Sequence, residues 1–153
     1  MTFLTQKIRI AIIVGDYHRS ITEALLTGSQ TTLMKHGVPK ENLTVLHVPG
    51  AVEIPLAAKL LAKTKQFDAI ICHGAVIRGD TDHYDYVCEQ LSQGCQQVMM
   101  TFDIPVIFGV LTTHNLQQAE ERIGGIHGHK GIEAADAALC MINIVKEWQP
   151  ISA

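Results

Sequence analysis

The sequence predicts an α/β fold, an α/β/α sandwich in which helices cover both faces of a four-stranded, doubly wound parallel sheet. Apolar, β-rich runs alternate along the chain with segments of helical periodicity, which is typical of parallel strands joined by right-handed crossovers. Hydrophobic residues make up 47% of the chain and aromatic residues only 5%, which favours a helix-covered sheet over an aromatic-rich β-sandwich. No linker divides the sequence, so we expect a single domain over residues 1–153.

The first half of the chain contains two strand–helix units. Residues 7–14 (KIRIAIIV) become continuously apolar toward their end, as expected of a central strand covered on both faces. Apolar residues then recur at helical spacing over residues 21–36, until a Gly-Val-Pro sequence ends the helix. The strand pattern returns at residues 43–48, and residues 53–63 have the composition of a helix that tolerates Pro55 in its first turn.

The second half continues the alternation. A third strand is predicted at residues 67–77 and is followed by a helix at 83–101. A fourth buried strand occupies residues 104–111, and a short helix follows at 116–122. After a connection rich in Gly and His, residues 131–147 form a long closing helix, whose alanines would let another element or subunit approach closely.

Composition excludes several classes of partner. The net charge is -3, with no basic stripe to neutralise phosphates along a duplex, so nucleic-acid binding is not expected. No apolar run approaches the roughly 20 residues of a membrane span. Four cysteines occur without a C-x-x-C spacing, and we interpret them as buried thiols of a reducing compartment, the cytoplasm. They are Cys72, Cys88, Cys95 and Cys140.

The strongest functional pattern is GAVIRGDTDHYDYV at residues 74–87, where an apolar strand leads through polar residues into a helix. Unpaired amides and partial positive charge make such a helix start receptive to anions. The backbone and the Thr81 hydroxyl could therefore hold a phosphate while His83 moves protons beside it. The alternative is that Asp80 or Thr81 is simply the N-cap and His83 an exposed first-turn residue.

Arg122 and Lys130 flank a glycine-rich turn. The planar guanidinium fork of Arg matches phosphate oxygens, and Lys supplies a point charge. The structural alternative is that Arg122 caps the end of a helix and Lys130 is solvated.

No metal or cofactor is expected. His127 and His129 could form half of a metal site, but their segment offers no evident carboxylate or thiolate partner. Gly15 stands alone after the first strand where a dinucleotide site needs G-x-G-x-x-G, and no phosphate-binding G-x-x-x-x-G-K-[ST] loop occurs.

Two aromatic residues and one acid remain as candidate ligand contacts. Tyr17 follows the first strand and could stack on a flat heterocycle, or be a turn residue with a solvated hydroxyl. Phe108 lies in the fourth strand and could equally be core. Glu53 begins a helix, where the helix dipole alone would favour an acid.

Together these segments resemble the lumazine synthase family, in order over nearly the whole chain. The matching stretches are VPGAVEIPL (48–56), GAVIRGDTDHYDYV (74–87), IPVIFGVLT (104–112) and the E-R-x-G to K-G-x-E-A-A region (121–135). The resemblance implies a flavodoxin-like sheet and condensation of 5-amino-6-(D-ribitylamino)uracil with 3,4-dihydroxy-2-butanone 4-phosphate. The products would be 6,7-dimethyl-8-ribityllumazine, phosphate and water, in the penultimate step of riboflavin biosynthesis, with no cofactor or metal.

The resemblance also implies roles for individual residues. His83 resembles the family's proton-transfer histidine, Arg122 its phosphate-binding arginine, and Lys130 a lysine near that phosphate. Asp80 and Thr81 match the phosphate-binding backbone. The remaining matches surround the pyrimidine and its ribityl chain: Tyr17, Ala51, Val52, Glu53, Ala75, Val76, Ile77, Gly79 and Phe108.

The same resemblance implies a homo-oligomer built from pentamers, single, paired or closed into an icosahedral shell, with riboflavin synthase as a candidate partner. A neighbouring subunit would complete each pocket, so Phe108 would serve a different site from its own chain's Tyr17. The chain departs from the family at Tyr17 and His18, where Phe or Trp followed by Asn is common. The alternatives are a shell-forming protein with weak catalysis or a binder of lumazine or phosphate ligands, and the joint presence of His83, Arg122 and Lys130 favours the enzyme.

Overall fold

A computed structural model describes residues 5–149, so residues 1–4 and 150–153 of the expected domain lie outside the described residues. It confirms the three-layer α/β fold with a four-stranded parallel sheet, in the order β2-β1-β3-β4. The strands are β1 (Ile10–Gly15), β2 (Leu43–Val48), β3 (Ala69–Ile77) and β4 (Val106–Thr113). The helices are α1 (Arg19–Lys35), α2 (Ile54–Lys63), α3 (His83–Phe102), α4 (Leu116–Glu120) and α5 (Lys130–Trp148). Short 3-10 turns are η1 (Thr5–Lys7), η2 (Lys40–Asn42) and η3 (Ala51–Glu53).

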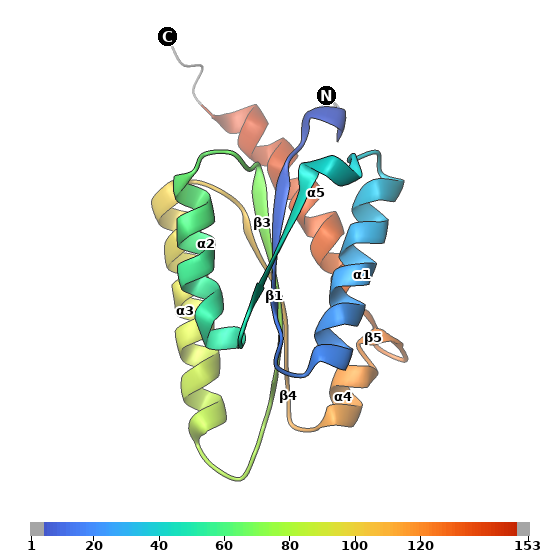
Figure 1. Ribbon diagram of the computed structural model, residues 1–153, viewed down its shortest axis with the longest axis vertical. Helices are drawn as coiled ribbons and strands as arrows, with labels where there is room; N and C mark the ends of the chain where they lie inside the picture. Colours follow the sequence, from blue (N-terminus) through green and yellow to red (C-terminus); the bar gives the residue numbers. More distant parts are fainter. Residues whose placement is uncertain (1–4, 150–153) are drawn as a thin grey trace.

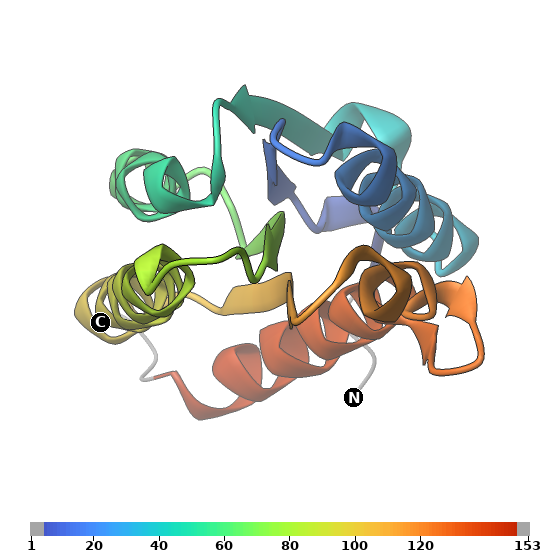
Figure 2. The same ribbon diagram turned by 90° about the horizontal axis from the view of Figure 1, so that it is seen from below.

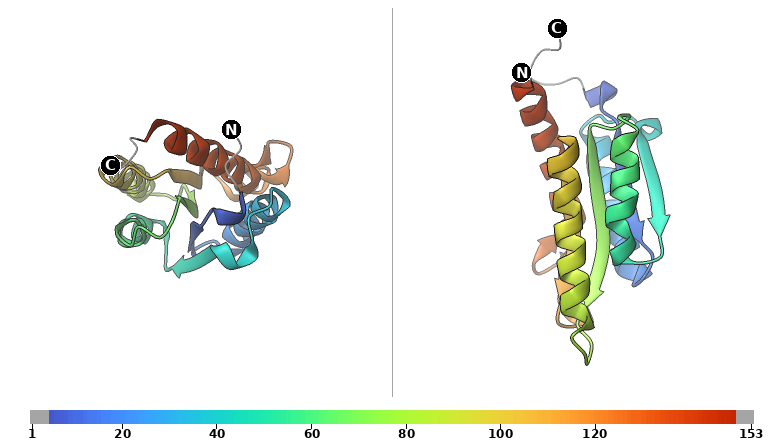
Figure 3. Two further views of the ribbon diagram at one scale, coloured as in Figure 1. Left: turned by 90° about the horizontal axis from the view of Figure 1, so that it is seen from above. Right: turned by 90° about the vertical axis from the view of Figure 1, so that its left-hand side faces the viewer.

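The helices divide between the two faces of the sheet. α2 and α3 lie side by side on one face, and α1, α4 and α5 cover the other (Figures 1, 2 and 3). β1 is buried at every position, which confirms its predicted central place, whereas β2 lies at an edge and is only half-buried. All four strands run the same way, so the turns leading to α1, α3 and α4 lie together at the carboxyl ends of the strands (Figure 1).

Differences from the expected elements are local. The first strand begins at Ile10 because Thr5–Lys7 forms a 3-10 turn, and the last helix begins one residue earlier, at Lys130. The Gly/His-rich connection holds a small antiparallel hairpin that was not predicted, β5 (Ile123–Gly125) and β6 (Gly128–His129). Such short strands carry no alternating pattern, and the hairpin depends instead on left-handed glycines, Gly124 and Gly128.

The expectation of four buried thiols is only partly correct. Cys72 and Cys95 are buried between β3 and α3, but Cys88 is half-buried and Cys140 is exposed. Apolar neighbours in the sequence do not determine which side of a helix faces the core, and Cys140 lies on the outer side of α5. All four cysteines are free.

A buried imidazole ties the two longest strands to α1. His73 of β3 is fully buried, with Nδ1 2.9 Å from the Gly109 carbonyl oxygen of β4 and Nε2 2.9 Å from the Ser29 hydroxyl of α1. A carbonyl only accepts hydrogen bonds, so Nδ1 of the neutral ring carries the proton and Nε2 is an acceptor that shares the Ser29 hydroxyl with the Leu26 carbonyl, 3.0 Å away. A Cβ at position 109 would lie 2.7 Å from Nδ1, so glycine is required there. Burial lowers the pKa of His73 to about 4, although the hydrogen bond to Gly109 partly opposes this shift.

This lowered pKa predicts a specific loss of stability in acid. The unfolded chain binds a proton at the ordinary histidine pKa, whereas the native His73 stays neutral until about pH 4. The free energy of unfolding should therefore fall as the pH drops from about 6.5 to 4, by on the order of 3 kcal/mol from this residue. Urea unfolding across this range checks it, with His73→Gln as the control. An equally steep fall in the variant would contradict the assignment.

Candidate active site

A cleft of about 460 Å³ lies at the carboxyl edge of the sheet, between the ends of β1 and β3 and the start of α3. It brings together predicted site residues from segments far apart in the sequence. Those that line it are Tyr17, Ala51, Val52, Glu53, Ala75, Val76, Ile77, Gly79, Thr81 and His83. The sequence did not predict four other lining residues, Pro49, Gly50, Tyr84 and Val87, and His18, noted only as a departure from the family, lines the cleft as well.

Backbone hydrogen bonds hold the two turns that form one wall of the cleft. The amide of Asp16 donates to the Val48 carbonyl at 2.9 Å, and the amide of Tyr17 donates to the Pro49 carbonyl at 3.1 Å. The turn after β1 is thereby fixed against the turn after β2. This contact sets the width of the cleft, because Tyr17 and Ala51 belong to the two turns and both line it.

Tyr17 and His18 form the outer lip of the cleft. The Tyr17 side chain is 70% exposed, and its ring meets the His18 imidazole edge-on with 4.6 Å between centroids. His18 has φ 59 and ψ 53, a left-handed conformation that is uncommon at the N-cap of a helix. Its side chain makes no capping hydrogen bond to α1, but its carbonyl accepts from the amides of Ile21 and Thr22 at 3.0 and 3.1 Å.

His83 is the first residue of α3 and is exposed to the cleft. The N-cap is Asp82, so the alternative that Asp80 or Thr81 occupies the cap position is wrong. The Thr81 hydroxyl nevertheless accepts from the His83 amide at 3.4 Å. The imidazole, the Thr81 hydroxyl and the positive end of a 20-residue helix therefore share one cleft.

Arg78 and Tyr84 brace the turn that leads into α3. The Arg78 guanidinium lies 5.3 Å from the centre of the Tyr84 ring and donates to the Asp85 carboxylate at 3.3 Å. Burial raises the pKa of the Tyr84 hydroxyl, so the ring remains neutral beneath this cation. These contacts restrain the residues on either side of His83.

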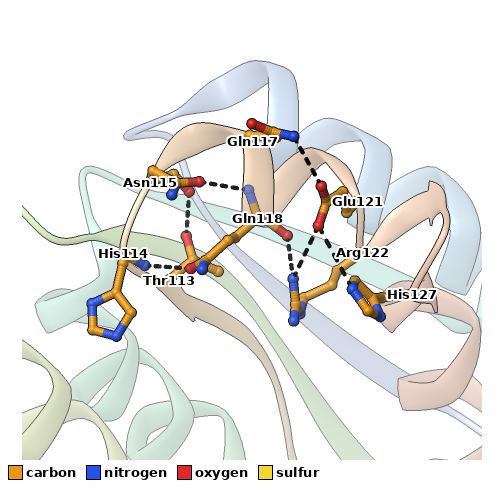
Figure 4. A network of polar contacts seen from close by, with 8 residues as sticks. All are labelled: Thr113, His114, Asn115, Gln117, Gln118, Glu121, Arg122 and His127. Atoms are coloured by element: carbon orange, nitrogen blue, oxygen red, sulfur yellow. Dashed lines mark hydrogen bonds and ion pairs between the residues drawn. The ribbon is translucent and has the colours of Figure 1, made fainter.

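A second cavity, of about 240 Å³, lies beside β4 and contains the predicted cations. It is lined by Val110, Leu111, Thr112, Thr113, Arg122, His127, Lys130 and Glu133. Nη1 of Arg122 donates to the Gln118 carbonyl at 2.7 Å, so the capping alternative for Arg122 is confirmed (Figure 4). The amide of Lys130 donates to the Arg122 carbonyl at 2.8 Å, which joins the two cations through the backbone.

The short helix α4 is fixed by its own polar residues (Figure 4). Asn115 is the N-cap, and its side chain accepts from the Gln118 amide at 2.8 Å. The Gln118 side chain accepts in turn from the His114 amide at 2.8 Å, and the Thr113 hydroxyl donates to the Asn115 carbonyl at 2.8 Å. This network attaches Arg122 to the end of β4.

The predicted site is thus divided within one chain. Four of the predicted site residues, all within the described part of the chain, do not line the cleft around His83: Asp80, Phe108, Arg122 and Lys130. Asp80 is exposed next to that cleft, and Phe108 is half-buried in β4 against the α2 and α3 layer. β4 is the edge strand on the side of the sheet opposite β2, and the cavity of Arg122 lies between the end of β4 and the start of α5.

The two histidines of the glycine-rich connection have different environments. His129 is the N-cap of α5, with Nδ1 accepting from the amides of Gly131 and Ile132 at 3.1 and 3.4 Å, a structural role that the sequence did not indicate. Within residues 5–149 no group of three His, Cys, Asp or Glu side chains is arranged to hold a metal ion. None of the helices described there has the length and apolar character needed to cross a membrane.

The fold and the cleft define an α/β protein whose candidate ligand site lies at the carboxyl edge of a doubly wound sheet. The family model for 6,7-dimethyl-8-ribityllumazine synthase matches residues 7–146. The chain is 52% identical over 139 residues to the 6,7-dimethyl-8-ribityllumazine synthase of Coxiella burnetii (strain CbuG_Q212), covering 91% of this chain and 92% of the relative. It is 50% identical over 137 residues to that of Parabacteroides distasonis (strain ATCC 8503), covering 90% and 86%. The chain therefore belongs to the 6,7-dimethyl-8-ribityllumazine synthase family.

The capping network of α4 yields a prediction on stability. Asn115→Ala should lower the free energy of unfolding by about 1 kcal/mol, because the Gln118 amide loses its acceptor. Asn115→Asp keeps an acceptor at the same place and should remain close to the parent protein. Urea unfolding of the three proteins checks this, and equal losses in both variants would show that the cap is not what stabilises α4.

Proposed function

We propose that this chain is a transferase that condenses 5-amino-6-(D-ribitylamino)uracil with 3,4-dihydroxy-2-butanone 4-phosphate. The products are 6,7-dimethyl-8-ribityllumazine, phosphate and water. The observation that carries the proposal is the convergence of residues 17, 51–53, 75–77, 79, 81 and 83 on one cleft that includes His83. A catalytically inactive shell or binding protein would not need a titratable imidazole at that point.

The reaction needs an anion site, a proton shuttle and a flat slot. The pyrimidine amino group attacks the ketone carbonyl and water leaves to give a Schiff base, phosphate is eliminated, and the ribityl-bearing nitrogen closes the ring onto the remaining carbonyl with loss of a second water. His83 moves protons during these steps. The amides at the start of α3 and the Thr81 hydroxyl bind phosphate, next to Asp80.

The slot for the pyrimidine lies between the lip and the floor of the cleft. Tyr17 stacks on the heterocycle, and Ala75, Val76 and Ile77 of β3 form an apolar floor. Glu53 and the backbone of Ala51 and Val52 supply hydrogen bonds to the polar edge and the ribityl hydroxyls. The chemistry requires no cofactor or metal.

Each site is completed by the neighbouring subunit of a homopentamer in this proposal. Arg122 and Lys130 of that subunit bind the phosphate, and its Phe108 closes the slot. The separation of the two cavities within one chain supports this, as do large apolar side chains that a lone subunit leaves exposed. They include Leu56 at 64%, Met100 at 69%, Ile126 at 82% and Trp148 at 79% exposure.

Pentamers that stay single, pair or close into an icosahedral shell are all consistent with these surfaces, and a shell could enclose riboflavin synthase. The free thiols support a reducing compartment, the cytoplasm.

The role of His83 is tested directly by product formation. His83→Ala should lower kcat by about 10²-fold or more with little effect on thermal unfolding, because the side chain is exposed and caps nothing in the described structure. Product absorbance after mixing both substrates provides the measurement. If wild type and variant had the same rate from pH 5 to 9, His83 would have no part in proton transfer.

The role of Arg122 is tested by comparing the two substrates. Arg122→Lys should raise KM for the phosphorylated ketone about tenfold or more and leave the pyrimidine largely unaffected, because only phosphate uses the guanidinium fork. Steady-state kinetics with each substrate varied in turn gives both values. An equal change for both would indicate that Arg122 acts only as the cap of α4.

A further inference from the structure

Glu121 lies between an arginine and a histidine side chain at the edge of the second cavity. Its Oε2 lies 3.9 Å from Nη1 of Arg122 and 3.7 Å from Nε2 of His127 (Figure 4). Its other carboxylate oxygen accepts from the Gln117 amide group at 3.2 Å. The carboxylate is thus held in place while one oxygen is shared between a permanent cation and a titratable imidazole.

The β5–β6 hairpin is what brings the imidazole to this carboxylate. The amide of His127 donates to the Glu121 carbonyl at 2.9 Å, so the turn folds back on the end of α4. A Cβ at Gly125 would lie 2.8 Å from the Glu121 Cα, and Gly128 is left-handed with φ 81. The position of His127 is therefore set by the backbone.

The charge balance of this cavity depends on His127. The charged and titratable groups that line or border it are Glu121 and Arg122 at the end of α4, His127, and Lys130 and Glu133 on α5. When His127 is protonated, its charge offsets the Glu121 carboxylate. When His127 is neutral, the nearest cation to that carboxylate oxygen is Arg122, whose attraction for a phosphate is then reduced.

We propose that Glu121 and His127 form a pH-sensitive pair that positions Arg122 and sets its affinity for the phosphorylated substrate. Protonated His127 offsets the Glu121 charge that faces Arg122 and so strengthens phosphate binding, whereas neutral His127 leaves that charge uncompensated and weakens it. Both are positioning residues, since they act through Arg122. The inference rests on the proposed function, in which Arg122 binds the phosphate.

The test compares KM for 3,4-dihydroxy-2-butanone 4-phosphate at about pH 6 and pH 8, where histidine changes charge. The substrate phosphate also titrates near pH 6, so each enzyme is compared with His127→Gln, which donates a hydrogen bond but does not titrate in this range. Relative to this variant, wild type should bind the phosphorylated substrate up to about fivefold more tightly at pH 6 and equally at pH 8. The KM for the pyrimidine should not change.

Glu121→Gln should change the KM for the phosphorylated ketone in the direction opposite to His127→Gln. It therefore distinguishes an effect of the Glu121 charge on Arg122 from a loss of structural support. Without the carboxylate, no negative charge competes with phosphate for Arg122 at either pH, so KM should stay low at pH 8, and adding His127→Gln should change nothing further. A matched control is His36→Gln, which removes the titratable partner of Asp136, 3.6 Å away and outside this cavity. Its KM values should follow wild type at both pH values.

Two results would overturn the proposal. One is the same ratio of KM between pH 6 and 8 in wild type and His127→Gln, and the other is weaker phosphate binding by Glu121→Gln in a protein with unchanged thermal unfolding. Arg122→Lys separates these from failure of the proposed function. If Arg122→Lys raises KM for the phosphorylated ketone while His127→Gln has no effect, only the proposed role of Glu121 and His127 is refuted. If Arg122→Lys has no effect on this KM, Arg122 does not bind the phosphate.

Discussion

The pairing of β3 with β4 is the constraint on which the two candidate half-sites depend. Their register is continuous from Ile70 opposite Val106 to Ile77 opposite Thr113. The last residues of β3 line the cleft of His83, and the last residues of β4 line the cavity of Arg122. One ladder therefore carries both groups of side chains and also keeps them apart. The buried hydrogen bond between His73 and Gly109 reinforces this ladder at its centre.

Local strain is concentrated at the entrance of the cleft. The left-handed backbone of His18 costs on the order of 1–2 kcal/mol, and Tyr17 beside it leaves most of its ring exposed. The other non-glycine residues with positive φ, Lys65 and Asp103, both lie at helix C-termini, where this conformation is common. His18 and Tyr17 both line the cleft, so this conformation lies at the edge of the candidate site.

Sequence reasoning predicted the elements that have a strong apolar pattern. The hydrophobic residues of the central strand β1 are continuous, and those of the long helix α3 recur at helical spacing. Few other secondary structures are compatible with these patterns. The β5–β6 hairpin and the histidine cap of α5 escaped prediction because each depends on a few local hydrogen bonds. The cleft around His83 was predictable because one continuous segment carries its strand end and helix start.

The division of the candidate site was predictable only through the family resemblance. Nothing in the residues around Arg122 indicates on which side of an edge strand the guanidinium lies, since that depends on the direction of α4 and the fold of the hairpin. The environment of His127 depends in the same way on its contact with Glu121 across the turn. The position of the Arg122 guanidinium and the environment of His127 depend on tertiary contacts, which leave no periodic pattern in the sequence.

In the proposed assembly, each active site combines the His83 cleft of one subunit with the Arg122 cavity of the next. Mixing His83→Ala with Arg122→Ala after joint unfolding and refolding tests this arrangement, because a site with both residues intact forms only between unlike neighbours. We predict that each variant alone has little activity and that the equimolar mixture recovers about one quarter of wild-type activity, as random assembly of a ring gives. If the mixed assemblies had no more activity than the average of the two variants, both residues would belong to the same subunit's site and the proposed arrangement would be wrong.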